Sequence, residues 1–229
     1  MSRPLRVLVV QGHGVVGGAE SWLLQVLDAT ERLDVTAVVL ADGPFVEQLR
    51  RRRVPTTVLP TGRRAVDGLR PAAQLRAVLR AQPWDVVLCN GVKAAALGVP
   101  VCFALGVPVV WAKHDHTFGA RVGRPLARLS TAVVVTEAQL LPEVGDAVVI
   151  PPPAPPASLD RATARRRLGL SGERPVLAVV GRLVDYKGFD DAVLALRGAS
   201  DWDLVVIGED DPADPGEQAR LEGLVSEHG

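Results

Sequence analysis

The chain has 229 residues, and its 26 lysines and arginines balance its 26 aspartates and glutamates. Hydrophobic residues make up 48% of the sequence and charged residues 23%, which excludes a disordered chain or a coiled coil. A balanced charge also argues against a general nucleic-acid-binding protein. Two cysteines, Cys89 and Cys102, cannot form a disulfide framework and indicate a cytoplasmic location.

The charges are unevenly distributed along the chain. Residues 1–150 carry 17 basic and 12 acidic side chains, whereas residues 151–229 carry 9 and 14. The sign changes at Pro151–Pro156, a proline-rich stretch that suits a stiff linker. We therefore expect two domains, 1–152 and 153–229, although chance in an arginine-rich sequence is an alternative explanation.

The first domain shows a regular succession of strands and helices. Apolar runs typical of strands are Leu5–Val10, Val35–Leu40, Thr56–Leu59, Asp85–Leu88, Val107–Trp111, Ala132–Val135 and Ala147–Ile150. Segments able to form helices include Ala19–Arg32, Phe45–Arg52 and Pro71–Ala81. The strands lack strict alternation, which is typical of strands covered on both faces. The pattern predicts an α/β domain with a doubly wound parallel sheet, that is, a Rossmann-like domain.

One stretch of the first domain imitates a membrane span. Ala94–Ala112 is uncharged and long enough to cross a bilayer. The Gly106–Val107–Pro108 sequence interrupts it, so we expect a buried helix followed by the strand Val107–Trp111. The N-terminus, in which Met1–Arg6 leads into a short apolar run, does not resemble a signal peptide.

The second domain begins the same pattern again and stops early. The expected elements are the helix Arg161–Leu168, the strand Pro175–Val180, the helix Phe189–Leu196, the strand Asp203–Ile207 and the helix Gly216–Glu227. Two parallel strands give too small a core for a free-standing sheet. We therefore expect an incomplete second Rossmann-like domain.

The loop after the first strand is rich in glycine. Gly12, Gly14 and Gly17 have the G-x-G-x-x-G spacing, and Asp42 follows the second strand, where it could bind a ribose. This pattern permits an NAD-binding oxidoreductase. It equally permits another anion at the start of the following helix, or only a tight turn.

Two histidines follow the strand Val107–Trp111. Ligands of doubly wound sheets bind at the carboxyl ends of the strands, so His114 or His116 could hydrogen-bond a substrate. A metal site is disfavoured because no third ligand has a recognisable spacing. Surface histidines without a role are the other alternative.

Two groups of cations stand out. Arg182 and Lys187 lie on the loop after the strand Pro175–Val180, next to a helix expected to begin near Gly188, and could bind a diphosphate. Arg50–Arg53, with Arg63 and Arg64 nearby, would complement a helix C-terminus or contact anionic lipid.

Three of these segments, with one more strand, resemble family 4 glycosyltransferases, which have the GT-B fold. They are Gly17–Glu20, the strand end Val109–His114, the loop Gly181–Phe189 (GRLVDYKGF) and the strand Leu204–Gly208. The loop resembles the family's donor-binding motif and is the most specific of them. The resemblance runs along essentially the whole chain but covers only the front part of the family's second domain.

The resemblance implies a retaining glycosyltransferase of the hexosyltransferase type, which moves a sugar from a nucleotide-sugar donor to an acceptor hydroxyl group without a metal or other cofactor. Arg182 and Lys187 would hold the donor diphosphate, with Gly17 and Gly18 close to it, and His114 would be the catalytic residue. Further substrate contacts would be Glu20, His116 and Gly208. The acceptor would be a glycan, a lipid-linked molecule or a small molecule, and any membrane contact would be peripheral, at the inner face.

The sequence also departs from the family pattern. It ends at Gly229, before the pair of glutamates that normally contacts the donor, and Glu209–Asp211 replaces a frequent second glycine. Pro151–Pro153 stands where an Asn-Gly step is frequent. A truncated or non-catalytic nucleotide-binding remnant is therefore an alternative, beside the NAD-binding oxidoreductase.

Overall fold

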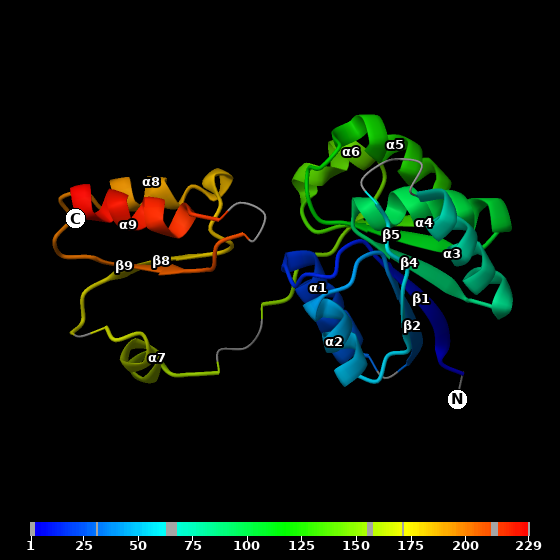
Figure 1. The fold of residues 1–229 in the computed structure, drawn as a ribbon, viewed down its shortest axis with the longest axis horizontal. Helices are drawn as coiled ribbons and strands as arrows, with labels where there is room; N and C mark the ends of the chain where they lie inside the picture. The colour runs from blue at the N-terminus through cyan, green and yellow to red at the C-terminus, as the bar shows by residue number, and fades with distance from the viewer. Residues whose placement is uncertain are drawn as a thin grey trace. The chain divides into compact units, whose positions relative to one another are not determined.

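The computed structural model describes residues 3–30, 32–62, 68–154, 158–170, 172–211 and 215–228. The chain divides into two compact units, Met1–Ala154 and Pro155–Gly229 (Figure 1). Pro151–Ala154 has no regular secondary structure, while Pro155 and Pro156 of the expected linker lie outside the described residues, as do Arg63, Arg64 and Gly229.

Among the residues described, the first unit contains a sheet of seven strands in the order β3-β2-β1-β4-β5-β6-β7 (Figure 1). The strands are β1 (Leu5–Gln11), β2 (Leu33–Val39), β3 (Thr56–Val58), β4 (Val86–Asn90), β5 (Val109–Lys113), β6 (Ala132–Val135) and β7 (Val148–Val149). All neighbouring pairs are parallel. The strand order reverses between β1 and β4, so the expected doubly wound sheet is confirmed.

Helices cover both faces of this sheet. They are α1 (Gly18–Asp28), α2 (Pro44–Arg51), α3 (Leu69–Ala81), α4 (Val92–Leu105), α5 (Gly119–Leu129), the short 3₁₀ helix η2 (Ala138–Leu140) and α6 (Leu141–Val144). Side chains of β1 alternate between two apolar clusters: Val7 and Val9 pack with α1 and α2, whereas Leu8 and Val10 pack with α3 and α4. A strand buried on both faces needs apolar residues at every position, which explains its unbroken apolar sequence.

The stretch that imitates a membrane span is α4 followed by β5, as expected. The helix ends at Gly106, whose φ of 66° is left-handed and whose N–H donates to the Cys102 and Phe103 carbonyl groups. The strand starts at Val109, two residues later than expected. In the described part of the chain, no helix has the length and apolar character needed to cross a membrane.

Helix α5 was not expected from the sequence, because Gly119, Gly123 and Pro125 are poor helix formers. Its packing accounts for one of them. A Cβ atom on Gly123 would lie 2.4 Å from the Glu143 carbonyl oxygen, so only glycine lets α5 approach α6 this closely. Tertiary contacts therefore override local propensity here.

The arginines at the end of α2 are held by carboxylates. Arg50 pairs with Glu47 at 2.6 Å, and Arg52 donates twice to Asp28 at 2.8 Å. The hydrogen bonds from Arg52 lower the pKa of Asp28. Ion pairs within the unit thus engage Arg50 and Arg52 of the run Arg50–Arg53.

The second unit is small. It contains a parallel pair of strands, β8 (Val176–Val180) and β9 (Asp203–Ile207), with α7 (Arg161–Arg167), the 3₁₀ helix η3 (Asp185–Lys187), α8 (Phe189–Ala195) and α9 (Glu217–His228). Each expected strand and α-helix of this unit is present within one residue of its expected bounds. Among the described residues of this unit, the buried hydrophobic ones are Leu183, Val184, Phe189, Val193 and Leu221, a small core for an independent domain.

Candidate functional site

A pocket of about 920 Å³ lies in the first unit, at the carboxyl ends of the strands. It opens where the strand order reverses, between β1 and β4, which is where doubly wound sheets bind ligands. Its lining mixes apolar side chains, such as Leu97, Phe118 and Val122, with polar ones from three neighbouring strand ends. A volume of this size accommodates a sugar or a larger small molecule.

Four polar side chains at this edge form one hydrogen-bonded chain. Gln11 Nε2 donates to Glu20 Oε1 at 2.6 Å, and Asn90 Nδ2 donates to Gln11 Oε1 at 2.6 Å. Asn90 Oδ1 lies 2.7 Å from His114 Nε2. Gln11 ends β1 and Asn90 ends β4, and the two residues face each other in the register of these parallel strands. The sheet itself therefore brings the chain together.

His114 is held as a neutral imidazole. Burial lowers its pKa to about 4, and the opposing effect of nearby Asp115 is smaller. Its ring also packs edge-on against Trp22, with 5.1 Å between the ring centroids. At neutral pH His114 is therefore an uncharged group that can donate one hydrogen bond and accept another.

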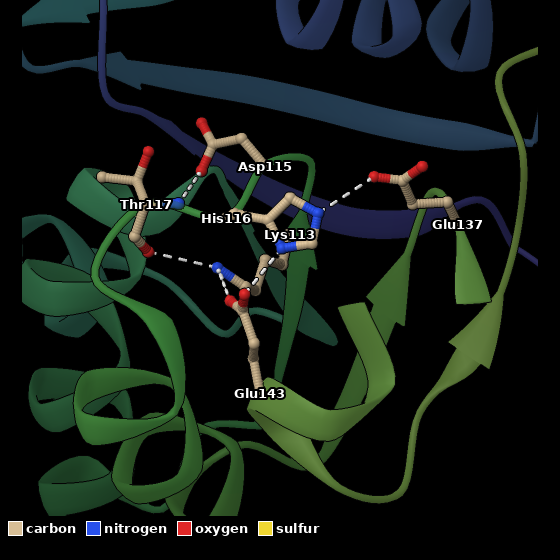
Figure 2. A network of polar contacts seen from close by, with 6 residues as sticks. All are labelled: Lys113, Asp115, His116, Thr117, Glu137 and Glu143. Carbon is tan, nitrogen blue, oxygen red and sulfur yellow. Dashed lines mark hydrogen bonds and ion pairs between the residues drawn. The ribbon is translucent and has the colours of Figure 1, made fainter. Parts of the chain in front are cut away.

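A second polar network fixes the loop that follows β5 (Figure 2). Lys113 is fully buried at the end of the strand, where its Nζ atom lies 3.0 Å from Glu143 Oε2 and donates to the Thr117 carbonyl oxygen at 3.2 Å. His116 Nδ1 lies 2.7 Å from the other oxygen of Glu143, and its Nε2 lies 3.5 Å from Glu137. Burial would raise the pKa of Glu143, but His116 and Lys113 together lower it.

This network sets the position of the pocket wall. His114, Asp115, Thr117 and Phe118 line the pocket and lie on the loop that Lys113 and Glu143 hold. Phe118 is 66% exposed and has a φ of 64°, which is strained for an aromatic residue. A buried charge pair at the foot of the loop is a rigid support for such a conformation.

The two histidines from the sequence are thus in different environments. His114 lines the pocket, whereas His116 pairs with Glu143 and Glu137 and is not among the pocket residues. Between the two alternatives, the geometry favours His114 as the residue that contacts substrate.

In the glycine-rich loop after β1, Gly14 has a structural role. A Cβ atom on Gly14 would lie 2.3 Å from the Asp42 carbonyl oxygen, so this glycine allows the loop to pack against the end of β2. The Asp42 carboxylate accepts a hydrogen bond from the Gly43 N–H and is not among the pocket residues. These contacts give Gly14 a packing explanation that needs no dinucleotide.

The side chain of Glu20 caps the start of its own helix, α1. The Gly17 N–H donates to Glu20 Oε2 at 3.0 Å, as in a capping box, and Glu20 is only 5% exposed. Around Gly18 there is open space, since a Cβ atom there would meet nothing within 4 Å. Of the two glycines expected near the donor, Gly18 therefore offers the more accessible backbone.

The expected donor residues lie in the second unit. Arg182 Nη1 lies 2.5 Å from Asp211 Oδ2, and Lys187 Nζ lies 5.5 Å from the centre of the Tyr186 ring. A Cβ atom on Gly208 would lie 2.0 Å from the Gly181 carbonyl oxygen, so Gly208 allows the loop that carries Arg182 to pack against the end of β9. In the structure, an internal carboxylate neutralises Arg182.

The described residues contain no group of three histidine, cysteine, aspartate or glutamate side chains that could hold a metal ion. Several residues of the site were not singled out from the sequence: Gln11, Asn90, Lys113 and Glu143. A usable signal for the first three was present, since each is a polar residue that immediately ends an apolar strand. Glu143 lies in a short helix far along the chain, and only the fold brings it to Lys113.

Comparison with known proteins gives a family and a fold. The model of Glycosyltransferase Family 4 matches residues 16–153, which is more than half of the chain. A search of curated protein sequences gave no significant match. Among solved structures, HepE of Anabaena in complex with UDP and glucose is similar, with a TM-score of 0.76, 20% identity, and coverage of 98% of this chain and 67% of that one.

Two further structures have a similar fold. A glycosyltransferase of Rickettsia africae has a TM-score of 0.69 and 16% identity, with coverage of 99% of this chain and 66% of that one. MurG of Acinetobacter baumannii has a TM-score of 0.61 and 15% identity, with coverage of 97% and 64%. The present chain thus spans about two thirds of the length of these proteins.

Proposed function

Because this chain belongs to glycosyltransferase family 4, we propose that it acts in the transfer of a sugar from a nucleotide-sugar donor to an acceptor hydroxyl group, with retention of configuration. The observation that carries the proposal is the pocket at the ends of β1, β4 and β5, which contains the neutral imidazole of His114. An uncharged imidazole can accept a hydrogen bond from a sugar or acceptor hydroxyl group.

The second unit would supply the charges for the leaving group. Arg182 and Lys187 would bind the diphosphate of the donor, and the diphosphate would replace Asp211 as the partner of Arg182. The complex of HepE with UDP-glucose supports a nucleotide sugar as the donor class and makes UDP the first nucleotide to test. Gly18 would contribute an accessible backbone N–H group.

The proposed reaction exchanges one glycosidic bond for another. The bond between the anomeric carbon and the diphosphate oxygen breaks while the acceptor oxygen bonds to the same face of the sugar. The proton of the acceptor hydroxyl group passes to the departing phosphate. Arg182 and Lys187 would stabilise the negative charge that develops on the leaving group.

The acceptor would be a glycan, a lipid-linked molecule or a small molecule, in the cytoplasm or at the inner membrane face. Exposed Arg50 and Arg51 at the end of α2 would favour peripheral contact with anionic lipid. Co-sedimentation with vesicles that contain or lack anionic lipid tests this contact, and equal binding to both would exclude it.

Calorimetric titration with UDP tests the donor site directly. We expect Arg182→Ala and Lys187→Ala each to weaken UDP binding by about 1–3 kcal/mol, the scale of a lost charge-assisted contact. Arg167→Ala, which removes an exposed arginine from α7 of the same unit, is the matched control and should leave binding unchanged. Unchanged UDP binding in both donor-site variants would refute the assignment.

Two further measurements separate the alternatives. Thermal protection by NAD⁺ but not by UDP or UDP-sugars would favour an oxidoreductase over a transferase. UDP binding without transfer of sugar to any acceptor, in a chain that spans about two thirds of similar proteins, would favour a nucleotide-binding remnant.

A further inference from the structure

The order of donors and acceptors in the hydrogen-bonded chain from Glu20 to His114 is set from its Glu20 end. The carboxylate of Glu20 accepts at both oxygens, from Gln11 Nε2 and from the Gly17 N–H. A carboxylate has only acceptor atoms, so Gln11 must turn its NH₂ group towards Glu20 and its carbonyl oxygen towards Asn90.

A backbone contact adds to the effect of Gln11 on the next side chain. Asn90 Nδ2 donates to Gln11 Oε1 at 2.6 Å and also to the Ala19 carbonyl oxygen at 3.1 Å. Both partners are acceptors, so the NH₂ group of Asn90 is placed on this side and its carbonyl oxygen faces His114. The orientation of each amide therefore follows from its neighbours rather than from its shape.

These amide orientations determine which ring nitrogen of His114 carries the proton. Asn90 Oδ1 is an acceptor 2.7 Å from His114 Nε2, so Nε2 must carry the proton and Nδ1 must carry the lone pair. Within the described part of the chain, Nδ1 makes no hydrogen bond. The reverse tautomer would set two lone pairs against each other among side chains that are 1% exposed, at Gln11 and Asn90.

We propose that Glu20, Gln11 and Asn90 are positioning residues that hold His114 in its Nε2–H form and present the Nδ1 lone pair to a hydroxyl group of the bound sugar or acceptor. The identity of that hydroxyl group rests on the proposed function, whereas the tautomer does not. A lone pair that is fixed before binding needs no rearrangement when the hydroxyl group arrives.

Glu20 is buried and forms no ion pair with the described residues, and the hydrogen-bonded chain explains its burial. Its carboxylate is satisfied by one amide and one backbone N–H, and its role is to set the orientation of the amides. Replacing one oxygen of Glu20 by NH₂ should therefore reverse the chain. In Glu20→Gln, the Gly17 N–H still needs the oxygen, so the new NH₂ group faces Gln11.

The reversal then propagates to the histidine. Gln11 would turn its oxygen towards residue 20 and its NH₂ group towards Asn90. Asn90 would then turn its NH₂ group towards His114, giving up its 3.1 Å hydrogen bond to the Ala19 carbonyl group, and the proton would move to Nδ1. We expect the ratio of Nε2–H to Nδ1–H to fall by at least about tenfold, which corresponds to about 1.4 kcal/mol. Long-range ¹⁵N–¹H NMR correlations of the imidazole measure this ratio without substrate.

Glu137→Gln is the matched control, because it makes the same atomic change beside His116 and outside the chain to His114. The proposal is supported if His114 is Nε2–H in the wild type and in Glu137→Gln and is shifted in Glu20→Gln. It is overturned if wild-type His114 is Nδ1–H, a result that does not depend on the folding of any variant. It is also overturned if folded Glu20→Gln keeps the wild-type ratio.

The NMR spectra and the calorimetric UDP titration together separate this inference from the proposed function. A wild-type Nε2–H form that shifts in Glu20→Gln, in a chain that binds no UDP, would leave the positioning role standing and refute a UDP-sugar donor. UDP binding together with an unshifted tautomer would do the opposite.

Discussion

Acidification should destabilise the first unit through His114. Its pKa is lowered from 6.5 to about 4 in the folded state, chiefly by burial. The folded protein therefore binds fewer protons at this site than the unfolded chain between these two pH values. Stability is fully present above about pH 6.5 and falls as the pH drops towards about 4, with no further loss from this group below that.

The size of the effect follows from the shift. One pKa unit corresponds to about 1.36 kcal/mol, so the displacement of His114 corresponds to about 3 kcal/mol of unfolding free energy. This is a large part of the roughly 5–15 kcal/mol that stabilises a typical protein. His114→Gln removes the titrating group and retains an amide N–H that can donate to Asn90.

Urea unfolding followed by tryptophan fluorescence measures the loss. Trp22, Trp84 and Trp111 lie in the first unit and Trp202 in the second, so a Trp202→Phe background reports on the first unit alone. Between about pH 7.5 and pH 4, the wild-type histidine should add about 3 kcal/mol to the loss seen in His114→Gln. Equal losses in the two proteins would show that His114 is not held neutral.

Two substitutions and one labelling experiment test the packing around the site. Glu143→Gln leaves Lys113 buried without its carboxylate and should cost about 3–5 kcal/mol in urea unfolding, and adding Lys113→Met should recover much of the loss. In Gly98→Ala, the new Cβ atom would lie 2.6 Å from Cys89 Sγ, so we expect a loss of about 1–3 kcal/mol that Cys89→Ala relieves. Burial raises the pKa of Cys102 to about 12 and that of Cys89 as well, so a thiol reagent should label both only on unfolding, and rapid labelling of the native protein would contradict their burial.

Much of the fold was predictable because its signals are local. An unbroken apolar run such as Leu5–Val10 predicts a strand buried on both faces, and β1 has that environment. The Gly106–Val107–Pro108 break separated α4 from β5 because glycine and proline act on the backbone at their own positions. Local signals did not predict helix α5, because its Gly123 is explained only by contact with the distant Glu143.

The site was less predictable because most of its partners are far apart in sequence. His114 could be found from its place after a strand, but its lowered pKa comes from burial, which other elements provide, with Trp22 packed against its ring. Glu20 is a predicted substrate contact and lines the pocket, but its hydrogen bonds to Gln11 and Gly17 could not be read from the sequence. Sequence spacing reveals which side chains reach an edge, and only the register of parallel strands reveals which of them meet.

Three buried polar residues end strands of the sheet in the first unit. Gln11, Asn90 and Lys113 are each at most 1% exposed, and burying such groups is unfavourable unless every hydrogen bond is made. Apolar residues at the same positions would extend the two clusters that already cover the sheet. All three polar groups nevertheless lie at the carboxyl edge, where they order His114 and its loop. Their placement agrees with the proposed ligand site, because doubly wound sheets bind ligands at this edge.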